Sequence, residues 1–190
     1  MKHLLLLIPL LLSACSLLMP VRDTSVRHRL ESTLADRSAK ASRPSVAIAR
    51  ASLPAYLDRE ELVTRDAGGE LQKHDTHLWS ESLDTGISRV IATNLRRLTG
   101  SRAIQPIDDF IALDYSHLVE IRVAQFDPDA SGNLILRCTW KAQPVTGGNV
   151  KSQSFSTTIP IQSSKAPMAG RIAAMNQALE TLSRDIARAL

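Results

Sequence analysis

The spacing of hydrophobic and polar positions along the chain predicts two amphipathic helices. From Leu83, apolar residues recur every three or four positions until Gly100, a glycine in the place typical of a helix C-terminus. The same spacing returns after Pro167 and continues to Ile186. We therefore predict one helix over about residues 80–99 and a second helix that closes the chain.

Three stretches between these helices alternate apolar and polar residues with the period of two that is typical of β-strands. They cover residues 116–126, 133–142 and 150–161, with turn-like sequences at 127–132 and at Gly147-Gly148. Such short connections predict an antiparallel meander. Shorter strands are predicted at residues 45–49, 62–64, 70–73 and 103–107.

The order of these elements, strands and helix followed by strands and helix, predicts an α+β fold. We expect an α/β sandwich, a mostly antiparallel sheet covered by two long amphipathic helices, one on each face. The chain has 190 residues, of which 44% are hydrophobic, with 8 Gly and 9 Pro. This length and composition allow a single ordinary domain.

The N-terminus carries an export signal. Lys2 and His3 precede the apolar run Leu4 to Leu12, which is interrupted only by Pro9. A run of about nine residues is well short of the roughly 20 that cross a bilayer as a helix. The segment is therefore predicted to be a signal peptide and not a membrane anchor.

The end of this signal, Leu12-Ser13-Ala14-Cys15, resembles the lipobox of bacterial lipoproteins, in which the cysteine is lipidated and becomes the new N-terminus. We expect residues 1–14 to be removed, Cys15 to carry the lipid, residues 15–43 to form a basic tether and residues 44–190 to form the domain. An ordinary secretory signal cleaved after Ala14 is the alternative. Because aspartate after the lipidated cysteine commonly marks inner-membrane retention, Ser16 favours the outer membrane by the same resemblance.

Composition and motifs argue against several classes of function. The formal net charge is only +4 and aromatic residues make up 4% of the chain, so no nucleic-acid surface is expected. The sequence has neither a Gly-x-Ser-x-Gly elbow nor a phosphate-binding Gly-x-x-x-x-Gly-Lys loop. We therefore predict no enzyme activity and no cofactor.

Two further groups of residues could in principle bind a metal or act as a reactive thiol, but the sequence does not favour either role. His74-Asp75-Thr76-His77 holds two imidazoles and a carboxylate, but it lacks the third and fourth ligands of a typical site, so no metal is predicted. Cys138 has no cysteine partner if Cys15 carries lipid, and it is predicted to be a small buried residue.

Residues 53–65 carry the most specific motif of the chain. Leu53-Pro54-Ala55-Tyr56-Leu57-Asp58-Arg59, followed by Leu62-Val63-Thr64-Arg65, resembles the Leu-Pro-x-Tyr-Leu-Asp-Arg-x-x-Leu-Val-x-Arg signature of the ABC-type transport auxiliary lipoproteins. Trp79-Ser80-Glu81-Ser82-Leu83 is similar to a second motif of that family, although Ser82 replaces its usual proline. The resemblance extends from about Ser45 to the C-terminus.

This resemblance implies an accessory lipoprotein of an MCE-type (mammalian cell entry) intermembrane lipid transport system. Such a protein is anchored to the outer membrane, faces the periplasm and docks to a periplasm-spanning MCE partner. The sequence leaves open whether the protein forms a homo-oligomer. The partner-binding candidates are Tyr56, Leu57, Asp58, Arg59, Arg65 and Trp79. The structural alternative is that Tyr56, Leu57 and Trp79 only cap the core. The functional alternative is a periplasmic lipid- or ligand-binding module with an apolar pocket.

Overall fold

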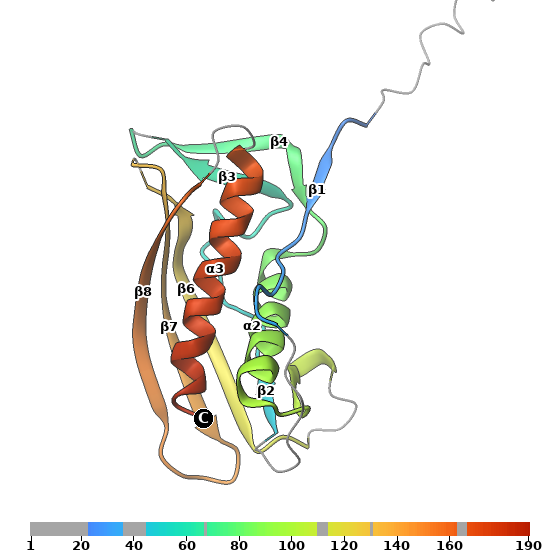
Figure 1. The fold of residues 1–190 in the computed structure, drawn as a ribbon, viewed down its shortest axis with the longest axis vertical. Coiled ribbons are helices and arrows are strands. Elements are labelled where there is room, and N and C mark those ends of the chain that lie inside the picture. The colour runs from blue at the N-terminus through green and yellow to red at the C-terminus, as the bar shows by residue number, and fades with distance from the viewer. Residues whose placement is uncertain (1–22, 36–44, 67, 110–113, 130, 163–166) are drawn as a thin grey trace, which may run out of the picture.

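A computed structural model describes residues 23–35, 45–66, 68–109, 114–129, 131–162 and 167–190 (Figure 1). The strands within these residues are β1 (Val26–His28), β2 (Val46–Ile48), β3 (Glu61–Arg65), β4 (Leu71–Trp79), β5 (Ile104–Pro106), β6 (His117–Pro128), β7 (Asn133–Pro144) and β8 (Lys151–Pro160). The helices are α2 (Leu83–Thr99), α3 (Pro167–Ala187) and the short 3₁₀ helix η2 (Ile107–Asp109). The predicted signal peptide and Cys15 lie outside the described residues.

The strands form two mixed sheets. A five-stranded sheet has the order β5-β2-β6-β7-β8, and a three-stranded sheet has the order β1-β4-β3. The predicted meander β6-β7-β8 and the β3-β4 hairpin are antiparallel, as expected. However, β2 is parallel to both β5 and β6, and β1 is parallel to β4. The prediction of a mostly antiparallel sheet is therefore wrong, because parallel pairs arise from long connections such as the one through α2, and local periodicity does not reveal them.

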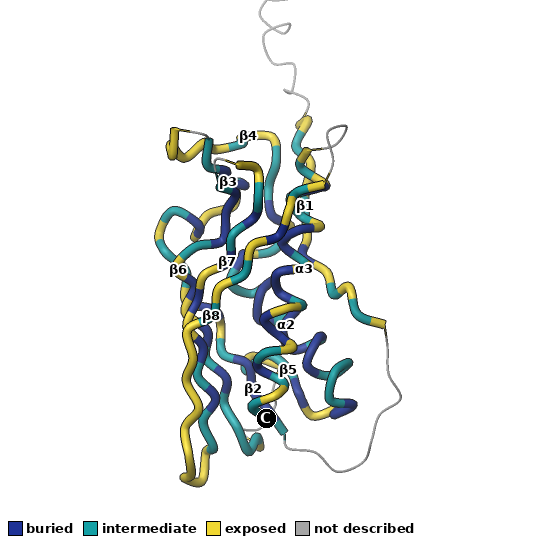
Figure 2. The backbone as a smooth tube through the Cα atoms, turned by 60° about the vertical axis from the view of Figure 1, so that its left-hand side comes forward, coloured by how far each residue is buried: buried dark blue, intermediate teal, exposed yellow. Residues whose placement is uncertain are grey.

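Both long helices lie on the same face of the five-stranded sheet (Figure 1). α3 packs on β7 and β8, whereas α2 packs on β2, β5 and α3. Residues on the other face of the meander are largely exposed, among them Arg122, Arg137, Thr139 and Ser154 (Figure 2). The prediction that one helix covers each face is wrong, since the period-two pattern makes only one face of these strands apolar.

The core lies between that apolar face and the helices. The side chains of Ile121, Leu134, Leu136 and Trp140 point inward and are buried, and Ile87 and Leu95 of α2 are completely buried. Trp140 also has a polar partner, because its indole Nε1 donates to Asp185 Oδ2 on α3 at 3.0 Å. Cys138 is buried in this core, which confirms the sequence prediction.

Residues 23–34 belong to the folded domain, although the sequence predicts a tether over residues 15–43. β1 joins the three-stranded sheet, and Leu30 is buried in the main core. Arg89 Nη2 donates to the Leu30 carbonyl at 2.6 Å, and Arg97 Nη1 donates to the Leu34 carbonyl at 2.7 Å. These bonds hold residues 30–34 against α2. No helix of the described part of the chain is long and apolar enough to cross a membrane.

Candidate functional site

The signature segment begins where the chain leaves the five-stranded sheet after β2. Ser52 still runs beside β6, since its N–H donates to the Ile121 carbonyl at 2.9 Å and its carbonyl accepts from Val123 at 2.8 Å. The chain then turns, and the Leu57 N–H donates to the Pro54 carbonyl at 2.9 Å. The loop is thus fixed beside β6 before it enters β3.

Two of the predicted partner-binding residues lie in the core. Leu57 is 5% exposed and Trp79 is 7% exposed, and both pack in the main hydrophobic cluster. Neither side chain is available to a partner in this conformation. For these two residues the structure corresponds to the alternative in which they cap the core.

Tyr56 and Arg65 converge on a buried carboxylate that the sequence analysis did not identify. The Tyr56 hydroxyl donates to Asp127 Oδ2 at 2.5 Å, and Arg65 donates from Nε to Oδ1 at 3.3 Å and from Nη2 to Oδ2 at 3.4 Å. Gln125 Nε2 donates to Oδ1 at 2.8 Å. The Asp127 carboxylate is 0% exposed, so it depends on these donors in place of water.

A β-bulge in β6 explains why Asp127 lies on this side of the sheet. The pairing of β6 with β7 shifts between Val123 and Gln125, so Ala124 is an extra residue. Beyond the bulge, Phe126 points into the core and Asp127 points to the opposite face, where Tyr56 and Arg65 cover it. Sequence composition placed Asp127 in a hairpin turn, whereas it is the penultimate residue of the strand.

The Asp127 carboxylate and its donors on Tyr56, Arg65 and Gln125 form a hydrogen-bonded cluster that we call the clamp. The Arg65 guanidinium lies 5.8 Å from the centre of the Tyr56 ring, close enough for a cation–π contact. Burial, followed by the hydrogen bond to Asp127, raises the pKa of Tyr56 to about 12. The hydroxyl therefore stays protonated near neutral pH and remains a hydrogen-bond donor.

Asp58 and Arg59 are the exposed members of the signature. They follow Leu57 at the outer end of the loop, and both are exposed. Within the described chain, no ion pair joins their two side chains. The half-buried Tyr56 and the buried Leu57 hold the backbone of this exposed pair in place.

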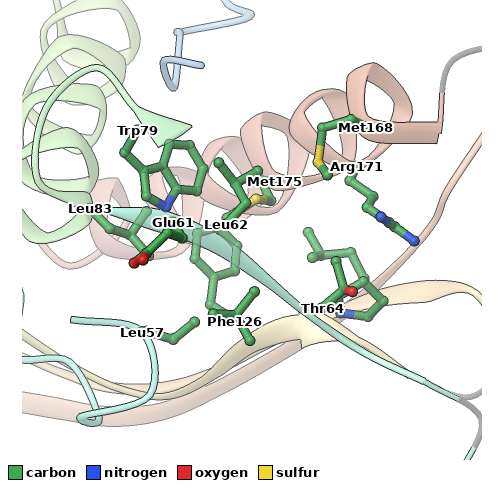
Figure 3. A pocket seen from close by; sticks show the side chains of 13 residues that line it. Leu57, Glu61, Leu62, Thr64, Trp79, Leu83, Phe126, Met168, Arg171 and Met175 are labelled. Atoms are coloured by element: carbon green, nitrogen blue, oxygen red, sulfur yellow. The ribbon is translucent and has the colours of Figure 1, made fainter. Parts of the chain in front are cut away.

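A small apolar cavity lies between β3, β4, β6 and the start of α3 (Figure 3). Its walls include Leu57, Leu62, Trp79, Phe126 and Met175, and its free volume is about 20 Å³. That space holds about one water molecule. It is far too small for the acyl chain of a lipid.

A larger and more open depression lies on the exposed side of the five-stranded sheet. It measures about 460 Å³, and its walls include Arg50, Arg122, Thr139 and Lys141. Two of the basic groups have carboxylate partners, since Arg50 Nε lies 2.7 Å from Asp108 and Lys141 Nζ lies 2.5 Å from Glu120. The depression is polar and open, unlike a lipid pocket.

The histidines of the predicted ligand-like cluster lie within β4 and not in a loop. Glu61 pairs with Leu78, but Leu62 pairs with His74, so residues 75–77 have no partners on β3. In the regular part of the ladder, His74 is the diagonal neighbour of Thr64 on β3, and its Nε2 contacts the Thr64 hydroxyl at 2.8 Å. His77 instead contacts His28 of β1, with Nδ1 and Nε2 2.9 Å apart.

These side chains do not assemble a metal centre. Within the described residues, no group of three His, Cys, Asp or Glu side chains is arranged to hold a metal ion. Sequence analysis also missed His28, because it lies in a short, charged and mostly exposed strand that shows no periodic pattern.

Comparison with known proteins assigns the fold and the family. Residues 28–187 match the model of a family described as the ABC-type transport auxiliary lipoprotein component. The chain also superposes on the crystal structure of an uncharacterized protein, with a TM-score of 0.69, 16% sequence identity and coverage of 87% of this chain and 97% of that one. A DUF330 protein from Xanthomonas campestris superposes with a TM-score of 0.65, 18% identity and coverage of 85% and 90%. These identities are low enough that the two likenesses establish the fold alone, and a comparison with curated protein sequences gives no match.

Proposed function

Because this chain belongs to the family of ABC-type transport auxiliary lipoproteins, we propose that it is an accessory subunit of an MCE-type intermembrane lipid transport system. Lipid on Cys15 anchors it to the outer membrane, and the domain faces the periplasm. Its role is to dock to a periplasm-spanning MCE protein, without catalysis of its own.

The observation that carries this proposal is that a buried carboxylate fixes the loop on which the charged pair Asp58 and Arg59 is exposed. Tyr56 and Arg65 both bind the fully buried Asp127, and this fixes the loop that presents Asp58 and Arg59 to solvent. Holding a charged pair on a rigid support lowers the entropy lost when a partner binds it. The exposed pair is therefore our docking site, and Tyr56, Leu57 and Arg65 support it.

The alternative of a lipid-binding module needs an apolar cavity large enough for a lipid. The apolar cavity described above holds about 20 Å³, whereas pockets for small ligands measure roughly 300–1,000 Å³. The filled core supports the docking role over the carrier role.

A binding experiment with matched surface variants tests the docking role. The lipidated protein is mixed in detergent with the purified periplasmic MCE protein of the same organism, and complex formation is measured by co-purification. We expect Asp58→Ala with Arg59→Ala to weaken capture, whereas Arg137→Ala, on the exposed face of β7, leaves it unchanged. Equal capture by all three proteins would remove the docking role from the signature loop.

A further inference from the structure

Arg171 is a partly buried guanidinium for which the described chain supplies no carboxylate. It lies in the second turn of α3 and forms part of the cavity wall on the side of Met168 and Thr64 (Figure 3). No described Asp or Glu lies within ion-pair distance of it. Among the residues that the structure does not describe, Asp36 is the only acidic one in the sequence.

The burial of Arg171 distinguishes it from ordinary surface arginines. Desolvation lowers the pKa of its guanidinium, and no opposing interaction raises that pKa. A charge that leaves water without a counter-charge destabilises the fold unless an anion is supplied from outside. The exposed Arg184 on the same helix has its counter-charge, since its Nη2 lies 2.8 Å from Glu180.

His74 adds a second nitrogen donor near the cavity wall that contains Arg171. Thr64, which also lines the cavity, contacts His74 Nε2 at 2.8 Å. The charged and titratable groups whose fields reach His74 are Arg171 and His77, and both disfavour its protonation. The rings of His74 and His77 lie 6.1 Å apart between their centres.

Asp75, which follows His74 in β4, and Glu61 of β3 already have a cation. Lys73 Nζ lies 2.7 Å from Asp75 and 3.2 Å from Glu61. Glu61 also lies at the opposite end of the cavity from Arg171 (Figure 3). The pair formed by Arg171 and His74 is therefore a concentration of nitrogen donors without an acidic partner in the described chain.

We propose that Arg171 and His74 form a binding site for a phosphate-type oxyanion, either free phosphate or the phosphate of a lipid headgroup. The guanidinium presents a fork of N–H donors suited to phosphate oxygens. Because the two side chains come from α3 and β4, a tetrahedral phosphate can accept from both, whereas a planar carboxylate held by the fork already uses both oxygens. The adjacent Met168 offers an apolar contact for the carbon atoms of a phosphate ester.

A titration of the purified full-length mature protein tests this site. The imidazole and guanidinium resonances are followed by NMR in an uncharged detergent at pH 6 and pH 8. The probes are inorganic phosphate, dihexanoyl phosphatidylglycerol and acetate. We expect saturable shifts of His74 and Arg171 with the two phosphate probes. Phosphatidylglycerol, whose charge does not change over this range, should bind more tightly at pH 6 than at pH 8, because a bound anion favours protonation of His74.

Single substitutions assign the binding to these side chains. Arg171→Gln and His74→Gln should each weaken phosphate binding by about tenfold or more, the usual effect of losing a charge-assisted hydrogen bond. Arg184→Gln is the control on the same helix and should bind as the wild type does. Arg171→Lys keeps the charge without the fork, so it should bind with intermediate affinity, and melting temperatures establish that each variant is folded.

The outcomes separate the source of the anion from the existence of the site. Binding of phosphatidylglycerol at least tenfold tighter than phosphate identifies a lipid headgroup, whereas equal affinities identify free phosphate. The proposal is overturned by the absence of saturable binding, by equal binding of acetate, or by binding that survives Arg171→Gln or His74→Gln. None of these results depends on whether the MCE protein binds the signature loop.

Discussion

Tyr56 and Asp127 are 71 residues apart in the sequence and meet in a hydrogen bond of 2.5 Å between the phenolic hydroxyl and Oδ2. The bond joins the signature loop to the end of β6. Because the Asp127 carboxylate is fully buried, each of its donors replaces a water molecule that solvent cannot supply. The shape of the loop thus depends on a residue that lies outside the signature.

Tyr56→Phe removes one donor from this carboxylate while keeping the ring. We expect the free energy of unfolding to fall by about 1–3 kcal/mol, the range for a buried polar group left without its partner. Urea denaturation measures the change. Asp58→Asn, at the exposed end of the same loop, should stay within about 0.5 kcal/mol of the wild type. Equal stabilities for the two variants would mean that the Tyr56 hydroxyl does not support the loop.

The helices and the meander could be predicted because each buries one apolar face. The predicted end of α2 at residue 99 is correct and its predicted start at residue 80 is three residues early. Gly100 adopts the left-handed φ of 74° that such a stop requires. The alternation of Leu134, Leu136, Cys138 and Trp140 likewise reports the buried face of β7. In these elements the local pattern and the tertiary environment agree.

Two of the remaining elements, β1 and β4, lack such a pattern. β1 has only three residues and β4 is mostly exposed, so neither shows the alternation of a half-buried strand. The candidate site depends on the bulge at Ala124, which reverses the orientation of Asp127, and on contacts between distant strands. The signature motif marks Tyr56 and Arg65, but no local pattern in the sequence predicts that Asp127 is their common partner.

The histidines on β1 and β4 predict a loss of stability in mild acid. Burial, followed by the field of His77, lowers the pKa of His28; burial, followed by Arg171 and His77, lowers that of His74. The unfolded chain therefore takes up protons at higher pH than the folded one, so these groups support stability above pH about 6.5 and lose that contribution as the pH falls through their folded pKa values. The hydrogen bond between His28 and His77 also requires at least one neutral ring.

Urea midpoints at pH 8, 6.5 and 5, measured without phosphate, test this dependence. The double variant His28→Gln with His74→Gln should lose less stability than the wild type between pH 6.5 and pH 5. Carboxylates titrate in both proteins, so the difference between the two curves isolates the imidazoles. Parallel curves would show that these rings do not govern the acid response.

Cys138 should be unreactive in the folded protein. Burial, followed by the nearby Asp185, raises the pKa of its thiol to about 12, and the thiolate is the reactive form. We expect iodoacetamide at pH 8 to modify Cys138 only after denaturation, as measured by mass spectrometry. Rapid modification of the native protein would show that the β7 face under α3 opens readily.

Cys15→Ala tests the predicted lipid anchor. Without lipid, the protein should leave the membrane fraction, because acyl chains supply about 0.8 kcal/mol of membrane binding for each buried methylene. The wild type should sediment with outer-membrane markers in a sucrose gradient, whereas Ser16→Asp should move to inner-membrane fractions. Membrane association of Cys15→Ala that survives a high-salt wash would contradict the anchor, and co-migration of the wild type with inner-membrane markers would contradict the outer-membrane location.

Leu95→Ala separates folding from docking. Leu95 lies on the buried face of α2 and is 0% exposed, so its truncation leaves a cavity and should destabilise the domain by about 2–5 kcal/mol. Arg59→Ala should instead change stability by no more than about 0.5 kcal/mol, since its side chain is exposed, yet weaken capture of the MCE protein. Melting temperatures and co-purification at low temperature, where both variants are folded, distinguish the two effects. If Arg59→Ala destabilises the domain and regains full capture in the cold, the signature arginine serves the fold and not the partner.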